Sequence, residues 1–314
     1  KTAPDWNGCR YLVRTALTPR GDAGASRVSG DFVEIRYDPA EGEYRTMRTA
    51  SRTGICALLL ASAAAFAGPW DDAAAAFGRG DFVTAAQLFR PLAEQGDAAA
   101  QYNLGVMYSG GQGVPQDYTE AVKWFRSAAA RGNALAQAGL GYLYASGQGV
   151  PTDYDEAEKW YRLAAAQGYS AGQAGLGSLY ASGQGVPLDL VEAEKWYRLA
   201  ADQGYGLAQA RLGALYARGE GVPVDYVEAV AWYRQAAERG YGSGMAGLGD
   251  LYATGKGVPV NSVLAHMWLN LAAAAGEPDA ARRRDLVAVH MTPAQIAAAR
   301  KLANEWQPAY PGPQ

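Results

Sequence analysis

The chain has 314 residues and a formal net charge of −3. A near-neutral balance without a polybasic surface argues against nucleic acid as a partner. The 20 tyrosines and 8 tryptophans recur at fixed intervals among many alanines and glycines, which suits a helical array with small residues at close helix contacts.

Residues 1–46 do not share the pattern of the rest of the chain. They contain Cys9 and a strand-like run, Asp31–Tyr37. Because the segment that follows has the features of a signal peptide, which acts at an N-terminus, we expect Met47 to be the true start. Residues 1–46 would then come from an over-extended reading frame or be disordered. The alternative is a real extra domain followed by an internal apolar helix.

Residues 47–67 have the composition of a secretory signal peptide. A basic region with Arg48 and Arg52 precedes a small, apolar stretch, and Ala65-Phe66-Ala67 supplies an A-x-A cleavage site. The stretch is too short for a membrane span. We therefore expect an exported protein, periplasmic or secreted, with no stable membrane anchor after cleavage. Both cysteines, Cys9 and Cys56, would be absent from the mature protein, which excludes disulfides, thiol chemistry and Cys-based metal sites.

Residues 68–96 read as a degenerate helical pair. The pattern predicts a short helix over Asp71–Phe77 and a second over Asp81–Gln95, with Leu88 where later units carry tryptophan. A unit at the end of a stacked array is expected to differ from the inner ones, because its outer face meets water.

The tripeptide Gly-Val-Pro occurs five times, always 36 residues apart, beginning at Gly113, Gly149, Gly185, Gly221 and Gly257. A fixed period of 20–50 residues indicates a stacked-repeat architecture. Each copy lies in a loop, because glycine and proline interrupt regular structure.

One unit shows how each repeat is built. Ala134–Ser146 is predicted to be a helix that ends at Gly147, a glycine in the left-handed conformation. Asp153 starts the second helix, and Glu156 follows at the spacing of a capping box. The same pair recurs as Asp117/Glu120, Asp189/Glu192 and Asp225/Glu228, whereas Asn261/Leu264 keeps only the cap.

Aromatic residues occupy fixed places in every unit. Trp160 and Tyr161 lie on one apolar face of the second helix, and the other units have Trp124/Phe125, Trp196/Tyr197, Trp232/Tyr233 and Trp268 with Leu269 there. We expect these side chains to form the core between repeats. Glycines such as Gly141 recur inside the first helices, where they cost helix propensity. They indicate a contact too close for a Cβ.

The repeated elements resemble the SEL-like repeat (SLR) family, αα repeats related to the tetratricopeptide repeat. In the second unit they are Ala136, Leu140, Gly141, Tyr144, Gly147, Gly149, Val150, Pro151, Asp153, Glu156, Ala157, Trp160, Tyr161, Ala164, Ala165 and Gly168. The resemblance covers about residues 97–276 and implies an all-α solenoid of stacked αα-hairpins. The units depart from the pattern at Gly172, Gly244 and Met245.

Residues 277–307 are expected to cap the array. A charged helix contains Arg282-Arg283-Arg284, and Thr292-Pro293 opens a final helix that runs to about Trp306. Residues 308–314 are expected to be a disordered tail.

No catalytic constellation is visible in the sequence. His266 and His290 are the only histidines, and neither has a partner at metal-ligand spacing. His266 is best read as a surface or satisfied interfacial residue. We expect no cofactor, no metal and no enzymatic activity.

The resemblance places a concave groove on the first helices, 98–109, 134–146, 170–181, 206–217 and 242–253. By analogy, the residues expected to contact a partner are Tyr102, Asn103, Tyr142, Arg211 and Asp250. The function that this implies is an exported adaptor that binds a protein or peptide in envelope regulation or host interaction. The alternatives are a cell-wall or β-lactam hydrolase, as for some cysteine-rich relatives, and a glycan-binding protein.

Overall fold

The computed structural model describes residues 35–38, 43–46 and 68–306. Strands β1 (Ile35–Asp38) and β2 (Glu43–Thr46) pair antiparallel, with Ile35 opposite Thr46. β1 overlaps the strand-like run expected from the sequence. The hairpin belongs to a different compact unit from the helices. The expectations for residues 1–34, for the signal peptide at 47–67 and for the tail at 308–314 lie outside the described residues.

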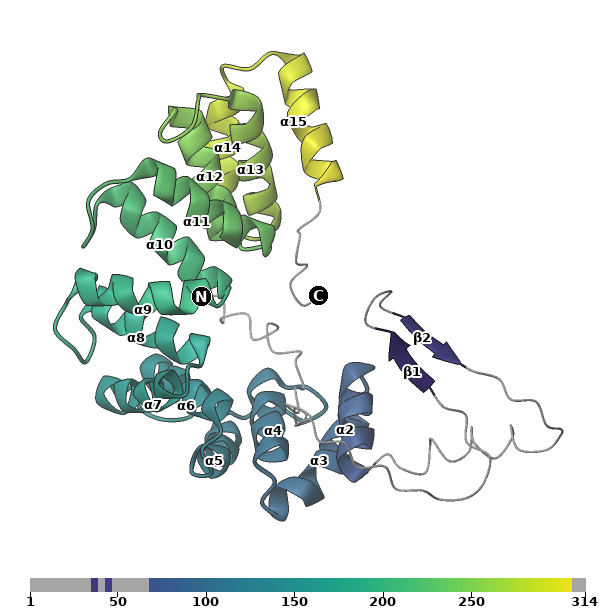
Figure 1. The fold of residues 1–314 in the computed structure, drawn as a ribbon. Helices are drawn as coiled ribbons and strands as arrows, with labels where there is room; N and C mark the ends of the chain where they lie inside the picture. Colours follow the sequence, from purple (N-terminus) through teal and green to yellow (C-terminus); the bar gives the residue numbers. More distant parts are fainter. Residues whose placement is uncertain (1–34, 39–42, 47–67, 307–314) are drawn as a thin grey trace. The chain divides into compact units, whose positions relative to one another are not determined.

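Residues 68–306 contain helices as their only regular elements, arranged along an arc as six successive pairs followed by two end helices that pack on the last pair (Figure 1). The pairs are α2 (Pro69–Gly78) and α3 (Phe82–Glu94), α4 (Ala98–Gly110) and α5 (Tyr118–Ala129), α6 (Ala134–Ser146) and α7 (Tyr154–Ala166), α8 (Ser170–Ser182) and α9 (Leu190–Asp202), α10 (Gly206–Arg218) and α11 (Tyr226–Glu238), and α12 (Gly242–Thr254) and α13 (Ser262–Ala274). The end helices are α14 (Ala280–Ala288) and α15 (Pro293–Glu305). The all-α solenoid expected from the sequence is confirmed.

The local signals at the helix ends act as predicted. Gly147 has φ 70° and ends α6, and the equivalent glycine ends every first helix from α4 to α12. Asp153 caps α7 by accepting a hydrogen bond from the Glu156 backbone at 3.0 Å. At α15 the Thr292 and Gln295 side chains complete a capping box.

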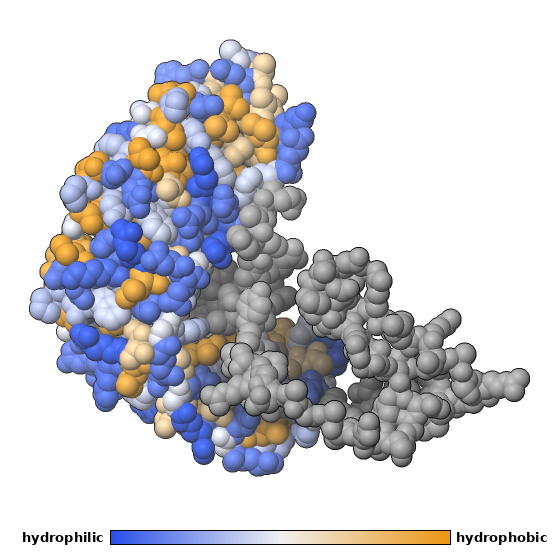
Figure 2. Space-filling view, viewed as in Figure 1, coloured by the Kyte–Doolittle hydropathy of each residue, from blue (hydrophilic) through white to orange (hydrophobic). Residues whose placement is uncertain are grey.

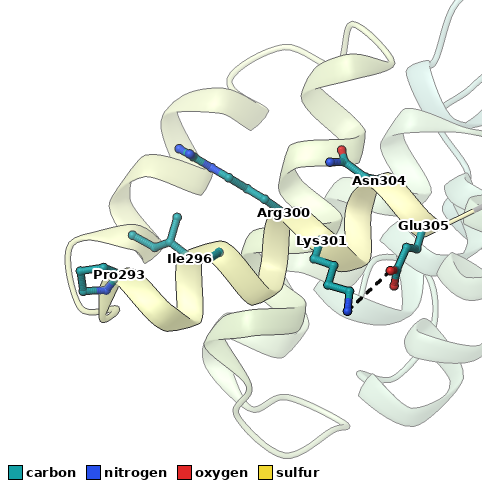
Figure 3. A pocket seen from close by; sticks show the side chains of 7 residues that line it. Pro293, Ile296, Arg300, Lys301, Asn304 and Glu305 are labelled. Carbon is teal, nitrogen blue, oxygen red and sulfur yellow. Dashed lines mark ion pairs between the residues drawn. The ribbon is translucent and has the colours of Figure 1, made fainter.

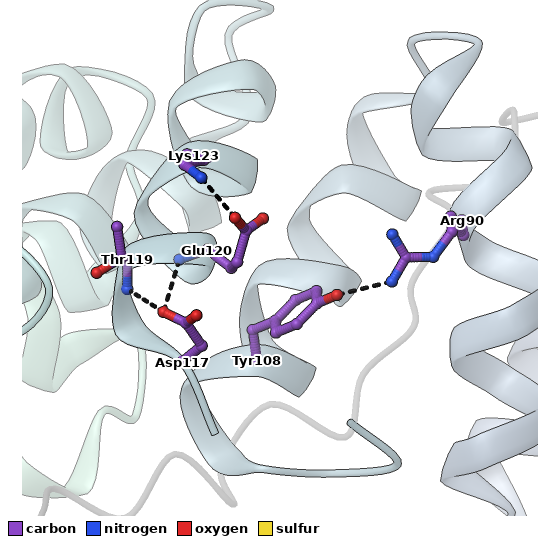
Figure 4. Close-up of polar contacts among 6 residues, drawn as sticks. All are labelled: Arg90, Tyr108, Asp117, Thr119, Glu120 and Lys123. Atoms are coloured by element: carbon purple, nitrogen blue, oxygen red, sulfur yellow. Dashed lines mark hydrogen bonds and ion pairs between the residues drawn. The ribbon is translucent and has the colours of Figure 1, made fainter. Parts of the chain in front are cut away.

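The capping boxes predicted for the inner units are not formed. The aspartates cap, but the glutamates point along the helix instead of back to the cap. Glu120 pairs with Lys123 at 2.5 Å, as Figure 4 shows beside the Asp117 cap. Glu228 instead accepts a hydrogen bond from the Trp232 ring at 2.9 Å. A cation or ring N–H one turn ahead is a better partner for the carboxylate than the cap backbone.

The recurrent first-helix glycines of units one to four receive an aromatic ring from their own unit, and Gly249 of the fifth unit receives Leu269. A Cβ on Gly141 would lie 2.6 Å from the Tyr161 ring, and one on Gly177 would lie 2.7 Å from the Tyr197 ring. The close contact inferred from the sequence is therefore confirmed, but it joins a ring to a helix. The backbones themselves approach closely at the departures Gly172 and Gly244, where a Cβ would meet the second helix.

Neighbouring units are joined by two kinds of repeated contact. Four tryptophans pack on the core cluster of the preceding unit, for example Trp160 on the cluster of Phe125; the others are Trp196, Trp232 and Trp268. Arg162 donates a hydrogen bond to the hydroxyl of Tyr180 in the next unit at 2.8 Å, and Arg90 does the same to Tyr108 (Figure 4). These contacts confirm that the aromatic residues form the core between repeats.

The first helices lie closer together than the second helices. α4 contacts α6, α6 contacts α8 and α10 contacts α12, whereas no two successive second helices contact as extensively. The first helices therefore line the inner side of the arc, as in the family that the sequence resembles. Counted from the unit that begins at Ala98, α14 takes the place of the first helix of a sixth unit. α13 packs against both α14 and α15.

Candidate protein-interaction surface

Each first helix exposes one stripe of residues to the inner side of the arc. Counting each 36-residue unit from Ala98, Ala134, Ser170, Gly206 and Gly242, the stripe consists of positions 2, 6, 9 and 13, spaced as one face of a helix. Positions 2, 9 and 13 are at least partly exposed in every unit, whereas position 6 is buried in the first two units and accessible in the other three. Positions 4, 7 and 8 between them are buried in every unit. We call the stripe of all five units the groove face.

Two of the expected contact residues are buried. Tyr102, at position 5, is 7% exposed and packs on Phe125 with ring centroids 5.8 Å apart. Asn103, at position 6 of the first unit, is 6% exposed. The other units have alanine at position 5, and these alanines are buried as well. Neither residue offers much surface to a partner.

The other three expected residues lie on the groove face in different states. Tyr142 is half-buried, and burial raises the pKa of its hydroxyl, while a hydrogen bond to Ser146 lowers it. Arg211 is exposed and makes no ion pair within residues 68–306. Asp250 is already bound, because Arg283 of α14 donates to its carboxylate at 2.6 Å. The groove face is thus not equally available along its length.

Charge on the groove face is concentrated near the fourth and fifth units. Arg218 lies seven residues after Arg211 on α10 and faces Glu220 at 3.9 Å, both side chains being exposed. Burial raises the pKa of Tyr233 to about 12, and Arg218 and Asp250 act on this hydroxyl in opposite directions. The tyrosine of the second helix therefore points its hydroxyl toward the charged end of the groove face.

Arg218 and Arg283 were not among the residues selected from the sequence. Arg218 stands where the other units have Gly110, Ser146, Ser182 and Thr254, so a comparison of the units at position 13 would have found it. Arg283 lies at position 6 of the incomplete sixth unit, which only the placement of α14 reveals. The hydrogen bond from Arg283 to Asp250 joins two units, and the sequence alone does not show which residues of different units meet.

His266 differs from the sequence expectation. It is 2% exposed on α13, and its Nδ1 atom has no hydrogen-bond partner among the described residues. It is thus an interfacial histidine, but neither a surface residue nor a fully satisfied one. Burial lowers its pKa, the charges of Arg284 and Arg300 lower it further, and Asp285 raises it. Two cationic side chains, Arg284 and Arg300, act on His266, and such neighbours disfavour the binding of a metal cation.

The described part of the chain contains no cluster of three His, Cys, Asp or Glu side chains that could hold a metal ion. The helices of residues 68–306 have at most 13 residues, and none of them is long and apolar enough to cross a bilayer. A depression of about 650 Å³ lies along α15 (Figure 3), and its described lining residues, which include Ile296 and Arg300, come from that one helix. This open, single-helix lining lacks the converging polar groups of a catalytic pocket.

A second exposed surface runs along the loop edge of the array. Leu188, Val224 and Val260 occupy position 19 of three successive units and are 63%, 52% and 65% exposed. In Figure 2 hydrophobic patches recur along the edge where the α8–α9 and α10–α11 loops project. The first two units have Gln116 and Thr152 there. This loop-edge row is separate from the groove face and competes with it as a contact surface.

The family model described as Sel1 repeat matches five consecutive segments, residues 98–133, 134–169, 170–205, 206–241 and 242–277. Among solved structures, a Sel1 repeat protein from Oxalobacter formigenes is 32% identical with a TM-score of 0.64, over 75% of this chain and 98% of that one.

The protective antigen c5321 of uropathogenic Escherichia coli, which displays an SLR fold, is 34% identical with a TM-score of 0.61 over 79% of this chain. The present chain spans only 56% of the length of that antigen. Proteins of curated function give no match.

Proposed function

Because this chain belongs to the Sel1 repeat family, we propose that it is an adaptor that binds a protein or peptide partner along the groove face. The proposal rests mainly on one observation, the accessibility of first-helix positions 2, 9 and 13 in all five units. Repeat solenoids present such extended surfaces for binding. A fold alone does not establish a function, so the residues on the groove face have to carry the argument.

The composition of the groove face favours an extended segment as partner. Most of its side chains are small, such as Gly139, Gly175, Ser178 and Ala214. Small residues let a peptide backbone approach the first helices closely, and Tyr142 offers a large amphipathic contact of the kind found at binding hot spots. Arg211 adds a charge that is not satisfied within the described residues.

Site-specific photo-crosslinking tests this proposal. A crosslinking amino acid is placed at Ala214 on the groove face, at Val224 on the loop-edge row, or at Arg234 on the second helix α11. We expect a discrete adduct from Ala214 in cells that make the protein, and none from Arg234. The double substitution Tyr142→Ala with Arg211→Ala should abolish that adduct. An adduct from Val224 alone would move the partner to the loop-edge row and contradict the proposal.

Export belongs to the same proposal. The order of basic, apolar and A-x-A segments in residues 47–67 supports cleavage before Gly68, with the mature protein in the periplasm or outside the cell. Mass spectrometry of the protein from expressing cells would then find Gly68 as its first residue. A mature protein that retains residues 47–67 would contradict export by this route.

A further inference from the structure

We propose that Arg211, Ser178 and Tyr197 form a binding site for the side-chain carboxylate of an aspartate or glutamate in the partner peptide. The inference deepens the proposed function and rests on it, because it assigns a chemistry to one place on the groove face. It comes from a comparison of the repeats with one another.

The repeat symmetry relates an occupied arginine to an unoccupied one. Arg283 lies at position 6 of the sixth unit and donates at 2.6 Å to Asp250, at position 9 of the fifth unit. Arg211 lies at position 6 of the fourth unit, and position 9 of the third unit is Ser178. Both pairs are 33 residues apart. Arg211 therefore faces the position that is equivalent to Asp250, and the residue at that position is Ser178, which has a hydroxyl group in place of a carboxylate.

The surroundings of Ser178 are suited to a carboxylate. The hydroxyl of Tyr197, which is 2% exposed, donates to the Ser178 hydroxyl oxygen at 3.1 Å. Burial raises the pKa of Tyr197, whereas the Ser178 hydrogen bond and the nearby Arg211 charge lower it. Arg211 thus lies close enough to this hydroxyl pair to act on it. A carboxylate could accept two hydrogen bonds from the Arg211 guanidinium and one from the Ser178 hydroxyl, whose oxygen already accepts the hydrogen bond from Tyr197.

The charged residues on this part of the groove face are two arginines, Arg211 and Arg218. None of the groove-face positions of units one to four holds an aspartate or glutamate. Arg218 is about 10 Å further along the same face of α10, from 1.5 Å per helical residue. Its contact with Glu220 is long and exposed, and such pairs are weak. A carboxylate arriving at Arg211 is therefore not opposed by a resident one.

The shape of the surface indicates a side chain of an extended peptide. The groove-face residues on both sides of Arg211 are small, namely Gly175, Ser178 and Ala214, and leave room for a peptide backbone. The groove face also continues in both directions from this point, so a peptide can pass through the site and need not end there. For this reason we assign the carboxylate to a side chain and not to a chain terminus.

Peptide arrays provide the test. One array contains acetylated, amidated octapeptides with a single Glu among Ala, Ser, Leu and Tyr, and a matched array carries Gln in place of Glu. We expect the wild-type chain to prefer the Glu members by roughly tenfold, the value of one charge-assisted hydrogen bond. The preference should disappear in Arg211→Gln. It should also disappear in Ser178→Asp, which supplies the missing acid from within the chain.

The controls separate this inference from the proposed function. Arg234→Gln removes an exposed arginine from α11 and should leave the Glu preference unchanged. Retention of Glu and Gln peptides alike, or a preference that persists in both groove variants, would overturn the carboxylate site while leaving the groove as a binding surface. Binding that requires a free C-terminus would overturn the side-chain assignment. No retention by any form of the protein would contradict both proposals.

Discussion

The ring of Tyr161 packs against Gly175 in the next repeat so closely that a Cβ on this glycine would lie 2.5 Å from ring atoms. The same ring also contacts Gly141 of its own unit. Tyr161 is 7% exposed, and burial raises the pKa of its hydroxyl. One aromatic side chain thereby joins two first helices, and the joint depends on glycine at both.

We therefore expect Gly175→Ala and Gly247→Ala to lower the free energy of unfolding by about 1–3 kcal/mol each, the usual cost of overpacking. At Gly247 the added carbon would meet Tyr233 at 2.5 Å. Urea denaturation followed by circular dichroism measures the effect. The matched control is Gly78→Ala at the end of α2, where no atom lies within 4 Å. Equal losses at all three sites would contradict the packing role.

The helix caps give a second prediction. Asp153→Ala should cost about 1 kcal/mol, because it removes the acceptor for a backbone N–H at the start of α7. Glu156→Gln should cost only a few tenths of a kcal/mol, the value of its exposed pair with Lys159. The denaturation midpoints of the two variants distinguish this arrangement from a full capping box, in which both substitutions would be costly.

The arginine–tyrosine bonds between units give a third prediction. Tyr180→Phe removes the acceptor of Arg162 and should destabilise the protein by about 0.5–1 kcal/mol, at the low end for a hydrogen bond because the pair is exposed. Tyr252→Phe is the control, because no equivalent bond joins Arg234 to Tyr252 within residues 68–306. Thermal denaturation should show a lower midpoint for the first variant alone.

His266 predicts a dependence of stability on pH. Burial and then Arg284 and Arg300 lower its pKa in the folded state, whereas an unfolded histidine has a pKa of about 6.5. The unfolded state therefore binds more protons below about pH 6.5. The contribution of neutral His266 is complete above that pH, and it is lost as the pH falls toward the lowered folded value.

Comparison of urea midpoints at pH 7.5 and pH 5.5 tests this prediction. His266→Val places at this position the residue that is buried there in two other units, Val122 and Val230. We expect this variant to lose less stability on acidification than the wild-type protein does. His290→Gln, which changes an exposed histidine, should keep the wild-type loss. An identical loss in all three proteins would rule out His266 as the cause.

The sequence was sufficient for features set by short-range chemistry. The 36-residue period, the left-handed glycine after each first helix and the aspartate caps depend on neighbours in the chain, and all of them are present in the structure. The final helix with its Thr292 cap also followed from local residues.

Features that depend on contacts between units could not be read in the same way. Tyr102 belongs to the buried position 5 and not to the groove face, since the relative rotation of the first helices decides which positions are covered. His266 is buried because α14 and α15 fold back onto α13. The Arg283–Asp250 bond depends on the same end helices. In each case the missing information was the orientation of one helix toward its neighbours.

The placement of α14 as an incomplete sixth copy has a consequence for how such proteins change length. Since Arg283 still reaches the preceding unit from its regular position, the terminal helices attach to the array through the same geometry that joins inner units. A block of 36 residues could be inserted or deleted ahead of Ala280 without redesigning the terminus. The span of target that the molecule can follow would then be adjustable in discrete steps during evolution, or by an engineer.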